Sequence, residues 1–166
     1  YDDVIVGTEG EGEIADGAGA AYVYLGSGDG ADTATEVKLL ASDGAEDDYF
    51  GLSVSGAGDI DGDGFGDVIA GAAGDASKTG AAYVFFGSSG GIDAASEVKL
   101  TASDGSTIDA FGYSVSGAGD VNGDGLSDVI VGARWDDSKA GSAYVFLGAT
   151  DGVDTSSETR LTATHG

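Results

Sequence analysis

The chain has 166 residues, 41% of them hydrophobic, which is enough for a domain with its own core. Aspartate and glutamate number 30 against six lysines and arginines, so the formal net charge is -24. Because phosphate binding depends on cationic side chains, this charge excludes nucleic acid and anionic membranes as partners. The absence of cysteine excludes disulfides and thiolate metal sites, and no apolar stretch approaches the roughly 20 residues of a membrane helix.

An internal repeat organises the sequence. Residues 50–87 and residues 111–148 align without a gap at an offset of 61 and are identical at 26 of 38 positions. Self-similarity at a long, fixed period indicates a repeat architecture.

A third, partial copy lies upstream of these two. Tyr1–Gly7 corresponds to Phe65–Gly71 at an offset of 64, and Gly19–Gly26 corresponds to Gly80–Gly87 at an offset of 61. The loop around residues 9–17 therefore carries three extra residues. The chain begins at Tyr1 rather than at a methionine, so we expect it to be a processed or excised piece of a longer protein.

Short strands separated by turns rich in glycine and aspartate are predicted in every unit. In the first unit, three strands are expected, and the counterpart of the opening strand of the other units is missing. In the second unit, four strands are predicted over Leu52–Ala57, Asp67–Ala72, Ala81–Phe86 and Glu97–Ala102. The third unit repeats these four at the offset of 61.

Four strands in each long repeat predict an all-β fold of β-propeller blades. The strand Ala81–Phe86 is apolar on both faces, which indicates a strand that is covered on both sides. We expect a partial blade at 1–49 and complete blades at 50–110 and 111–166. A β-solenoid usually has much shorter coils, and a β-sandwich needs no near-identical units. Closed propellers have about four to eight blades, so these blades would be open or part of a larger propeller or assembly.

Two matched loops between the first and second strands carry the clearest chemistry. Oxygen-bearing side chains occupy positions 1, 3, 5 and 9 of each loop, and glycines at positions 4 and 6 allow sharp turns. We predict two Ca²⁺ sites, each held by these side chains, one backbone carbonyl and water. The predicted ligands are Asp59, Asp61, Asp63, the carbonyl of Phe65, and Asp67 in one loop, and Asp120, Asn122, Asp124, the carbonyl of Leu126, and Asp128 in the other.

Other kinds of metal site fit these loops less well. An EF-hand requires a glutamate at position 12 and flanking helices, but position 12 is Ala70 or Val131 and the flanks look like strands. Mg²⁺ rarely uses all-protein cages, and Zn²⁺ is disfavoured without histidine or cysteine. Asp3 matches position 9, but its partners are missing, so no complete site is predicted there.

The repeated motifs resemble those of a known family over nearly the whole chain. Phe50-Gly51, the following aspartate loop and Gly71-Ala72-Ala73 resemble the FG-GAP repeat of integrin α-subunit propellers, and Phe111-Gly112 begins a second match. The resemblance implies mainly structural Ca²⁺ in loops on one rim, with ligands bound elsewhere. The Gly-Ala-Pro of the family is replaced here, since the chain has no proline.

Several other residues recur or break the repeat. Tyr22, Tyr83 and Tyr144 occupy one strand position and are interpreted as packing between blades. The segments that begin at Asp75 and Asp136 are predicted to be solvated loops. Arg134-Trp135 departs from the repeat, and both a local lid and a partner contact stay open. The only histidine is His165, which disfavours an enzyme.

The function expected from these residues is a secreted, extracellular or cell-surface module. It would be stabilised by calcium and act in adhesion or as a structural scaffold, and it would be able to self-assemble. The expected partners are further propeller blades, from the same longer chain or from neighbouring copies, and a protein or glycan ligand. The alternative is a carbohydrate- or protein-binding module attached to a larger secreted enzyme.

Overall fold

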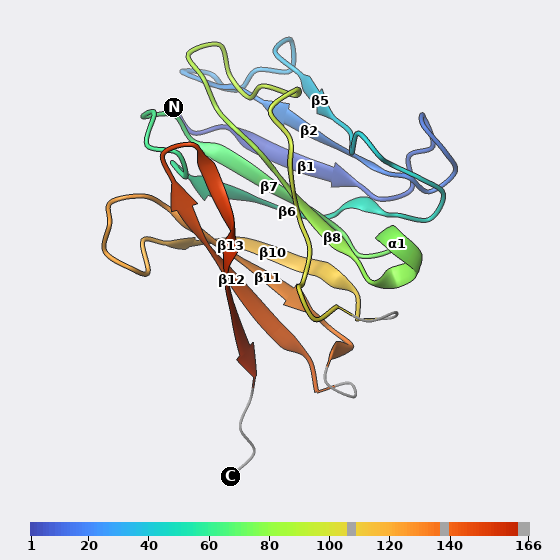
Figure 1. Ribbon diagram of the computed structural model, residues 1–166. Coiled ribbons are helices and arrows are strands. Elements are labelled where there is room, and N and C mark those ends of the chain that lie inside the picture. The colour runs from blue at the N-terminus through green and yellow to red at the C-terminus, as the bar shows by residue number, and fades with distance from the viewer. Residues whose placement is uncertain (106–108, 137–139, 163–166) are drawn as a thin grey trace.

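The computed structural model describes residues 1–105, 109–136 and 140–162, and its strands form three stacked antiparallel sheets (Figure 1). The first sheet has the order β1-β2-β5 and is followed in the chain by two four-stranded sheets. Its strands are β1 (Val4–Thr8), β2 (Ala20–Tyr24) and β5 (Val37–Leu39). The chain between β2 and β5 forms a small separate hairpin of β3 (Gly26–Ser27) and β4 (Gly30–Ala31).

The second and third sheets repeat one another strand for strand. The second sheet consists of β6 (Phe50–Gly58), β7 (Asp67–Ala72), β8 (Ala81–Phe85) and β9 (Val98–Leu100), with the short helix α1 (Asp75–Lys78) between β7 and β8. The third sheet consists of β10 (Phe111–Gly119), β11 (Asp128–Ala133), β12 (Ser142–Ala149) and β13 (Gly152–Thr162). Each sheet follows the chain order of its strands.

This architecture confirms the predicted all-β fold of antiparallel, blade-like sheets. The first sheet has three strands, as expected for the partial unit, and the other two have four. The proposed division of the chain after residues 49 and 110 stays a prediction, because strand pairing defines sheets and not independent folding units. No helix in the described part of the chain is long and apolar enough to cross a membrane.

The hydrophobic core lies between the sheets in two layers. One layer joins Val23 and Leu39 of the first sheet to Val68, Tyr83 and Phe85 of the second. Another layer of the same kind lies between the second and third sheets. Every residue of β8 is buried, which confirms that this strand is covered on both faces. Burial of apolar surface between stacked blades is therefore what holds the array together.

The Phe-Gly pair of each four-stranded sheet fits closely against the preceding sheet. Gly112 has a φ of +83°, and a Cβ atom placed on it would lie 2.0 Å from the carbonyl oxygen of Ala81. A Cβ atom on Gly71 would lie 2.0 Å from the carbonyl oxygen of Gly112. Only glycine satisfies this backbone conformation and this approach without strain, so the motif marks the joint between two sheets.

Candidate cation-binding loops

The two aspartate loops connect the first two strands of each four-stranded sheet. β6 ends at Gly58, β7 begins at Asp67, and the loop between them carries Asp59 and Asp61. Gly62 and Gly64 have φ values of +78° and +92°, so the sharp turns expected at positions 4 and 6 are present. The loop thereby folds back over the beginning of β7.

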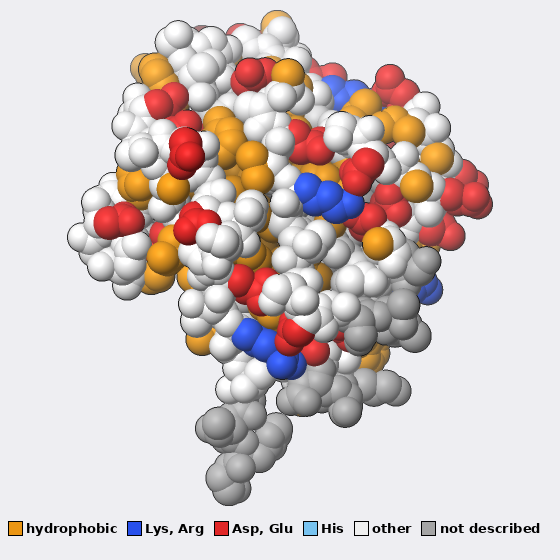
Figure 2. Space-filling view, viewed as in Figure 1, with side chains coloured by type: hydrophobic (Ala, Val, Ile, Leu, Met, Phe, Trp, Pro, Cys, Tyr) orange, Lys and Arg blue, Asp and Glu red, His pale blue; other side chains and the backbone are white. Residues whose placement is uncertain are grey.

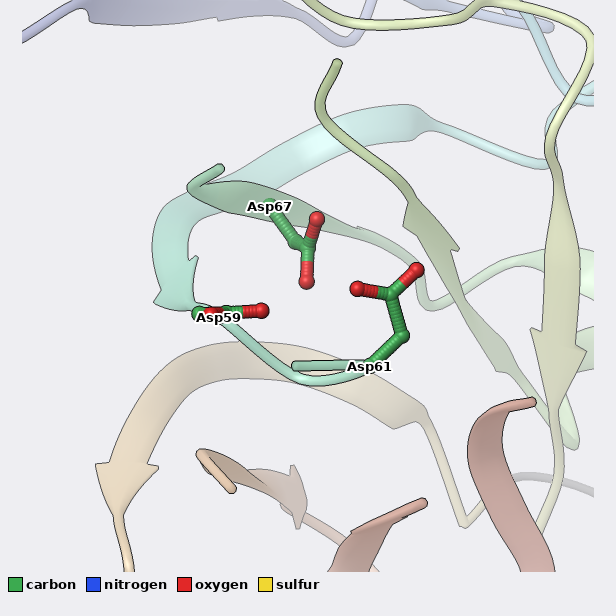
Figure 3. A group of neighbouring side chains, drawn as sticks. All are labelled: Asp59, Asp61 and Asp67. Carbon is green, nitrogen blue, oxygen red and sulfur yellow. The ribbon is translucent and has the colours of Figure 1, made fainter. Parts of the chain in front are cut away.

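In the first loop three of the predicted ligands converge. One carboxylate oxygen from each of Asp59, Asp61 and Asp67 lies within 4.8 Å of the others, and Figure 3 shows the side chains pointing toward one another. Among the described residues this is the only such group of three or more histidines, cysteines or acidic residues. The donors are all carboxylate oxygens, which suits a hard divalent cation.

Backbone N–H groups hold the acidic side chains of this loop in place. The N–H groups of Gly62 and Gly64 donate to the two oxygens of Asp59 at 2.7 and 3.0 Å. Asp63 is exposed, and its carboxylate accepts a hydrogen bond from the N–H of Phe65 at 2.8 Å. Asp63 is not one of the three converging side chains, and the roles of Asp63 and of the Phe65 carbonyl as ligands stay predictions.

Asp67 is the buried anchor of the first loop. Its two oxygens accept hydrogen bonds from the N–H groups of Ile60 and Gly87, both at 2.7 Å. The pKa of Asp67 is raised from 3.8 to about 6, chiefly by burial and also by the nearby carboxylates of Asp61 and Asp59, although both N–H donors act in the opposite direction. A cation among these groups would offset the cost of this buried charge.

The second loop has the same backbone scaffold and one carboxylate fewer. Asp128 accepts hydrogen bonds from Val121 and Gly148 at 2.7 and 2.9 Å, as Asp67 does from the equivalent residues. Position 3 is Asn122, whose side-chain amide donates to Asp124 at 2.8 Å. The ligand roles predicted for the second loop, including those of Asp120 and the Leu126 carbonyl, likewise stay predictions.

The two loops lie against each other. The N–H of Ser127 donates to the carbonyl oxygen of Asp59 at 2.8 Å. A Cβ atom on Gly62 would lie 2.8 Å from Cδ2 of Leu126, and one on Gly148 would lie 2.6 Å from the carbonyl oxygen of Ile60. Both loops therefore belong to one rim of the stack and form part of the joint between the second and third sheets.

Comparison with protein families matches the description "FG-GAP repeat" to residues 33–85 and 95–146, which together make up more than half of the chain. The chain belongs to the FG-GAP repeat family.

Curated relatives of this FG-GAP chain include several integrin α subunits. It is 38% identical to integrin alpha-E of Mus musculus over 123 residues, which cover 70% of the chain and 10% of the relative. It is 34% identical to integrin alpha-4 of Xenopus laevis over 137 residues, which cover 82% and 13%. With integrin alpha pat-2 of Caenorhabditis briggsae the identity is 45% over 102 residues, covering 59% and 8%. The chain thus spans about a tenth of the length of these relatives.

A second charged cluster of the FG-GAP chain corrects one sequence prediction. The segments beginning at Asp75 and Asp136 are predicted to be solvated, but both side chains are buried. Asp75 lies 2.9 Å from the hydroxyl oxygen of Tyr83, and Asp136 lies 2.6 Å from that of Tyr144. The solvated interpretation is wrong for these two aspartates because each contacts a tyrosine hydroxyl. Residues 137–139, and His165, lie outside the described residues.

These clusters join successive sheets of the FG-GAP array. Lys99 contacts both Asp75, in helix α1 of its own repeat unit, and Asp43, in the segment that follows the first sheet. Asp43 also lies 2.8 Å from the Tyr83 hydroxyl. Arg160 contacts Asp136 and Asp104 in the same manner, at 2.9 and 3.0 Å. Tyr83 and Tyr144 therefore pack between sheets, as predicted, and also bind carboxylates, which the sequence interpretation missed. Tyr22 belongs to neither of these cores, and its hydroxyl donates to Glu11.

A signal for this cluster was present in the sequence. Its members recur together at the offset of 61, as a tyrosine, a cation and two aspartates. A set of acidic residues that recurs together with a cation and a buried aromatic residue indicates a paired structure rather than a hydrated surface. Figure 2 shows the resulting surface, on which the few basic groups are bordered by acidic ones.

Arg134 and Trp135 form an exposed stack at the end of the third sheet. The Arg134 guanidinium lies 4.7 Å from the ring centre of Tyr113 and 4.6 Å from that of Trp135, and it donates to the Tyr113 hydroxyl at 2.6 Å. Both rings are exposed. The local-lid and partner-contact interpretations both stay open, because stacked, exposed aromatic residues suit either role.

Proposed function

We propose that this FG-GAP chain is a calcium-stabilised module of an extracellular or cell-surface protein, where it acts in adhesion or as a structural scaffold and has no catalytic activity of its own. The observation that carries the proposal is the convergence of Asp59, Asp61 and Asp67 in the first loop. Three carboxylates at this distance repel one another strongly unless a cation lies among them.

Two Ca²⁺ ions per chain are proposed, one in each loop. In the first loop the ion would be held by Asp59, Asp61, Asp63, the Phe65 carbonyl and Asp67. In the second loop the ligands would be Asp120, Asn122, Asp124, the Leu126 carbonyl and Asp128. The matching hydrogen bonds of Asp67 and Asp128 support a common scaffold for the two sites.

A structural role for the ions fits the position of the loops. Because the loops contact each other at the joint between two sheets, an ion in either loop would stabilise that joint. Extracellular modules bind Ca²⁺ with dissociation constants of about 10⁻⁴–10⁻³ M, so such sites stay loaded where calcium is abundant. The integrin α relatives support an adhesion or scaffold setting, with further propeller blades and a protein or glycan ligand as partners.

A second candidate function is a carbohydrate- or protein-binding module attached to a larger secreted enzyme. The exposed stack of Tyr113, Arg134 and Trp135 favours it, because aromatic rings and arginine are typical of binding surfaces. Loss of glycan or protein binding on changing Trp135→Ala, with unchanged calcium binding, would support this alternative.

Calorimetric titration with Ca²⁺, combined with thermal melts in Ca²⁺ and in EDTA, tests the main proposal. We expect two sites per chain and a large rise in Tm with Ca²⁺, since a ligand that binds only the folded state stabilises it by mass action. Both effects should be lost when Asp61→Ala and Asp124→Ala are combined. No binding and no change in Tm would refute the calcium assignment.

A further inference from the structure

Asn122 is the only residue of the chain with a side-chain amide, since the sequence contains no second asparagine and no glutamine. It precedes Gly123, at positions 3 and 4 of the second aspartate loop. Asparagine is thermolabile, because the nitrogen of the following peptide group can attack the carbon of its side-chain amide. A following glycine has no side chain to hinder this attack, so the chain has one site at which the reaction is favoured.

The folded loop leaves this dipeptide accessible. Asn122 and Gly123 are both exposed, and no atom lies within 4 Å of a Cβ atom placed on Gly123. The φ of Gly123 is +79°, close to the +78° of its counterpart Gly62 in the first loop. Packing against the neighbouring sheets therefore does not block the glycine side of this peptide group.

Hydrogen bonds hold the two reacting groups close together. The N–H of Asp124 donates to Oδ1 of Asn122 at 3.0 Å, and this bond closes a small ring that contains both Cγ of Asn122 and the backbone nitrogen of Gly123. The NH₂ group of Asn122 donates to Oδ2 of Asp124 at 2.8 Å, which sets the orientation of the amide. Such a fixed geometry favours attack within the ring, and the Asp124 N–H would stabilise the negative charge that develops on Oδ1.

Asp120 provides an acceptor for the proton that the attacking nitrogen must lose. Its Oδ1 accepts a hydrogen bond from the N–H of Gly123 at 2.6 Å, a distance suited to proton transfer. The N–H groups of Asp124 and Gly125 also donate to this carboxylate, at 3.1 and 2.9 Å, and fix its orientation. The loop thus places a nucleophile, a proton acceptor and a donor for the developing charge around one amide carbon.

We propose that the folded second loop promotes deamidation of its own Asn122. The backbone nitrogen of Gly123 bonds to Cγ of Asn122 and gives its proton to Asp120. The bond from Cγ to Nδ2 then breaks, and the amide nitrogen takes up that proton and leaves as ammonia. Water opens the resulting succinimide ring at either carbonyl group. Hydrolysis at Cγ gives an aspartate, and hydrolysis at the backbone carbonyl carbon gives an isoaspartate, in which the main chain runs through Cγ.

The aspartate product would make the acidic residues of the second loop match those of the first. Position 3 of the first loop is Asp61, whose Oδ1 accepts a hydrogen bond from the N–H of Asp63 at 3.1 Å, as Asn122 does from Asp124. The same backbone therefore already accommodates an aspartate. The isoaspartate product instead lengthens the main chain by a methylene group and would displace the neighbouring carboxylates. The consequence for calcium rests on the proposed function, whereas the covalent step needs no cation.

Intact-mass measurement of the full chain, held in neutral buffer with EDTA below its Tm, tests the proposal. We expect the folded chain to exchange NH for O in its mass and to release an equivalent amount of ammonia. Trypsin cleavage after Lys99 and Arg134 should place the change in the peptide 100–134, in which chromatography separates the aspartate and isoaspartate forms. Asn122→Gln is the matched control. It retains an amide but would have to form a larger ring, so its mass should stay constant.

Asp120→Ala tests whether the loop promotes the reaction. In the folded state this variant should react several-fold more slowly, because the Gly123 proton loses its acceptor, whereas in urea the two unfolded chains should react equally fast. A folded, unmodified chain that keeps its mass while the unfolded chain gains it would overturn the proposal, as would a folded Asp120→Ala that reacts at the unmodified rate. Deamidation in EDTA by a chain that binds no Ca²⁺ in calorimetry would refute only the calcium assignment.

Discussion

The N–H of Ser127, at the end of the second aspartate loop, donates to the carbonyl oxygen of Asp59, at the start of the first, over 2.8 Å. The next residue, Asp128, is the buried anchor of the second loop. Calcium at either loop would therefore fix a segment that takes part in the joint between two sheets. The stability of this joint should depend on the carboxylates of both loops.

Exchanging the residues at position 3 of the two loops tests how charge sets calcium affinity. Asn122→Asp gives the second loop the carboxylate that Asp61 provides in the first, and we expect calcium affinity there to rise about tenfold, or about 1.4 kcal/mol. In EDTA the same change should lower Tm, because it adds a repelling charge and removes the Asn122–Asp124 hydrogen bond. Asp61→Asn should have both opposite effects in the first loop. Unchanged affinities in both variants, measured calorimetrically, would contradict a role for position 3 in binding.

The raised pKa of Asp67 predicts the pH dependence of the calcium-free protein. The folded state holds this proton up to about pH 6, whereas an ordinary aspartate loses it near 3.8. The folded state therefore gains stability from this bound proton below about pH 4 and loses it as the pH rises through 6. The loss in the free energy of unfolding is on the order of 3 kcal/mol. Urea unfolding in EDTA between pH 4 and 7 should show this decline, and excess Ca²⁺ should remove it by stabilising the charged form.

Asp67→Asn is the control for this pH dependence. The variant cannot titrate at this position, so the decline between pH 4 and 6 should become smaller. Its absolute stability should also fall, because an amide has one acceptor oxygen and the N–H groups of Ile60 and Gly87 require two. A decline of unchanged size in Asp67→Asn would assign the effect to other groups.

The repeat in the sequence allowed most of the fold to be predicted. The predicted strand Asp67–Ala72 coincides with β7, and the predicted Leu52–Ala57 lies within β6. The alternation of apolar residues predicts each strand from its own segment, and the period of 61 places the equivalent strand in the next unit. The fourth strand of the second unit is shorter than predicted, because β9 pairs with β8 only over Val98–Leu100. The fourth strand of the third unit begins earlier than predicted, because β13 continues its pairing with β12 back to Gly152.

What sequence reasoning missed depends on tertiary contacts, both within one unit and between sheets. The segment that begins at Asp75 has the composition of a solvated loop. Only the folded structure brings the Asp75 side chain into contact with Tyr83 and Lys99. The contact of Asp43 with Lys99 spans 56 positions and arises when one sheet stacks on the next. The aspartate loops, by contrast, could be predicted, because their residues follow a fixed spacing within one short segment. The convergence of Asp59, Asp61 and Asp67 agrees with that spacing.

The joint between the second and third sheets should be sensitive to the glycine of the Phe-Gly motif. Gly112→Val places a branched side chain at a φ of +83° and 2.0 Å from the Ala81 carbonyl oxygen. We expect a loss of about 3 kcal/mol or more in the free energy of unfolding, measured in urea with saturating Ca²⁺. Gly56→Ala is the control, since no atom lies within 4 Å of a Cβ placed there, and it should change stability by less than about 1 kcal/mol.

Lys99 should stabilise the contact between the first and second sheets by pairing with the buried Asp75 and the exposed Asp43. Lys99→Met retains the apolar stem but leaves Asp75, whose side chain is 11% exposed, without its cation, and we expect a loss of about 2 kcal/mol. Lys99→Arg should restore most of the stability, because Arg160 occupies the equivalent position and makes the equivalent contacts in the third sheet. Raising the salt concentration should reduce the difference between the Met and Arg variants only slightly, because partly buried pairs are weakly screened. Equal free energies of unfolding in urea for the unmodified chain, Lys99→Met and Lys99→Arg would show that the ion pairs of Lys99 contribute nothing to the contact between the first and second sheets.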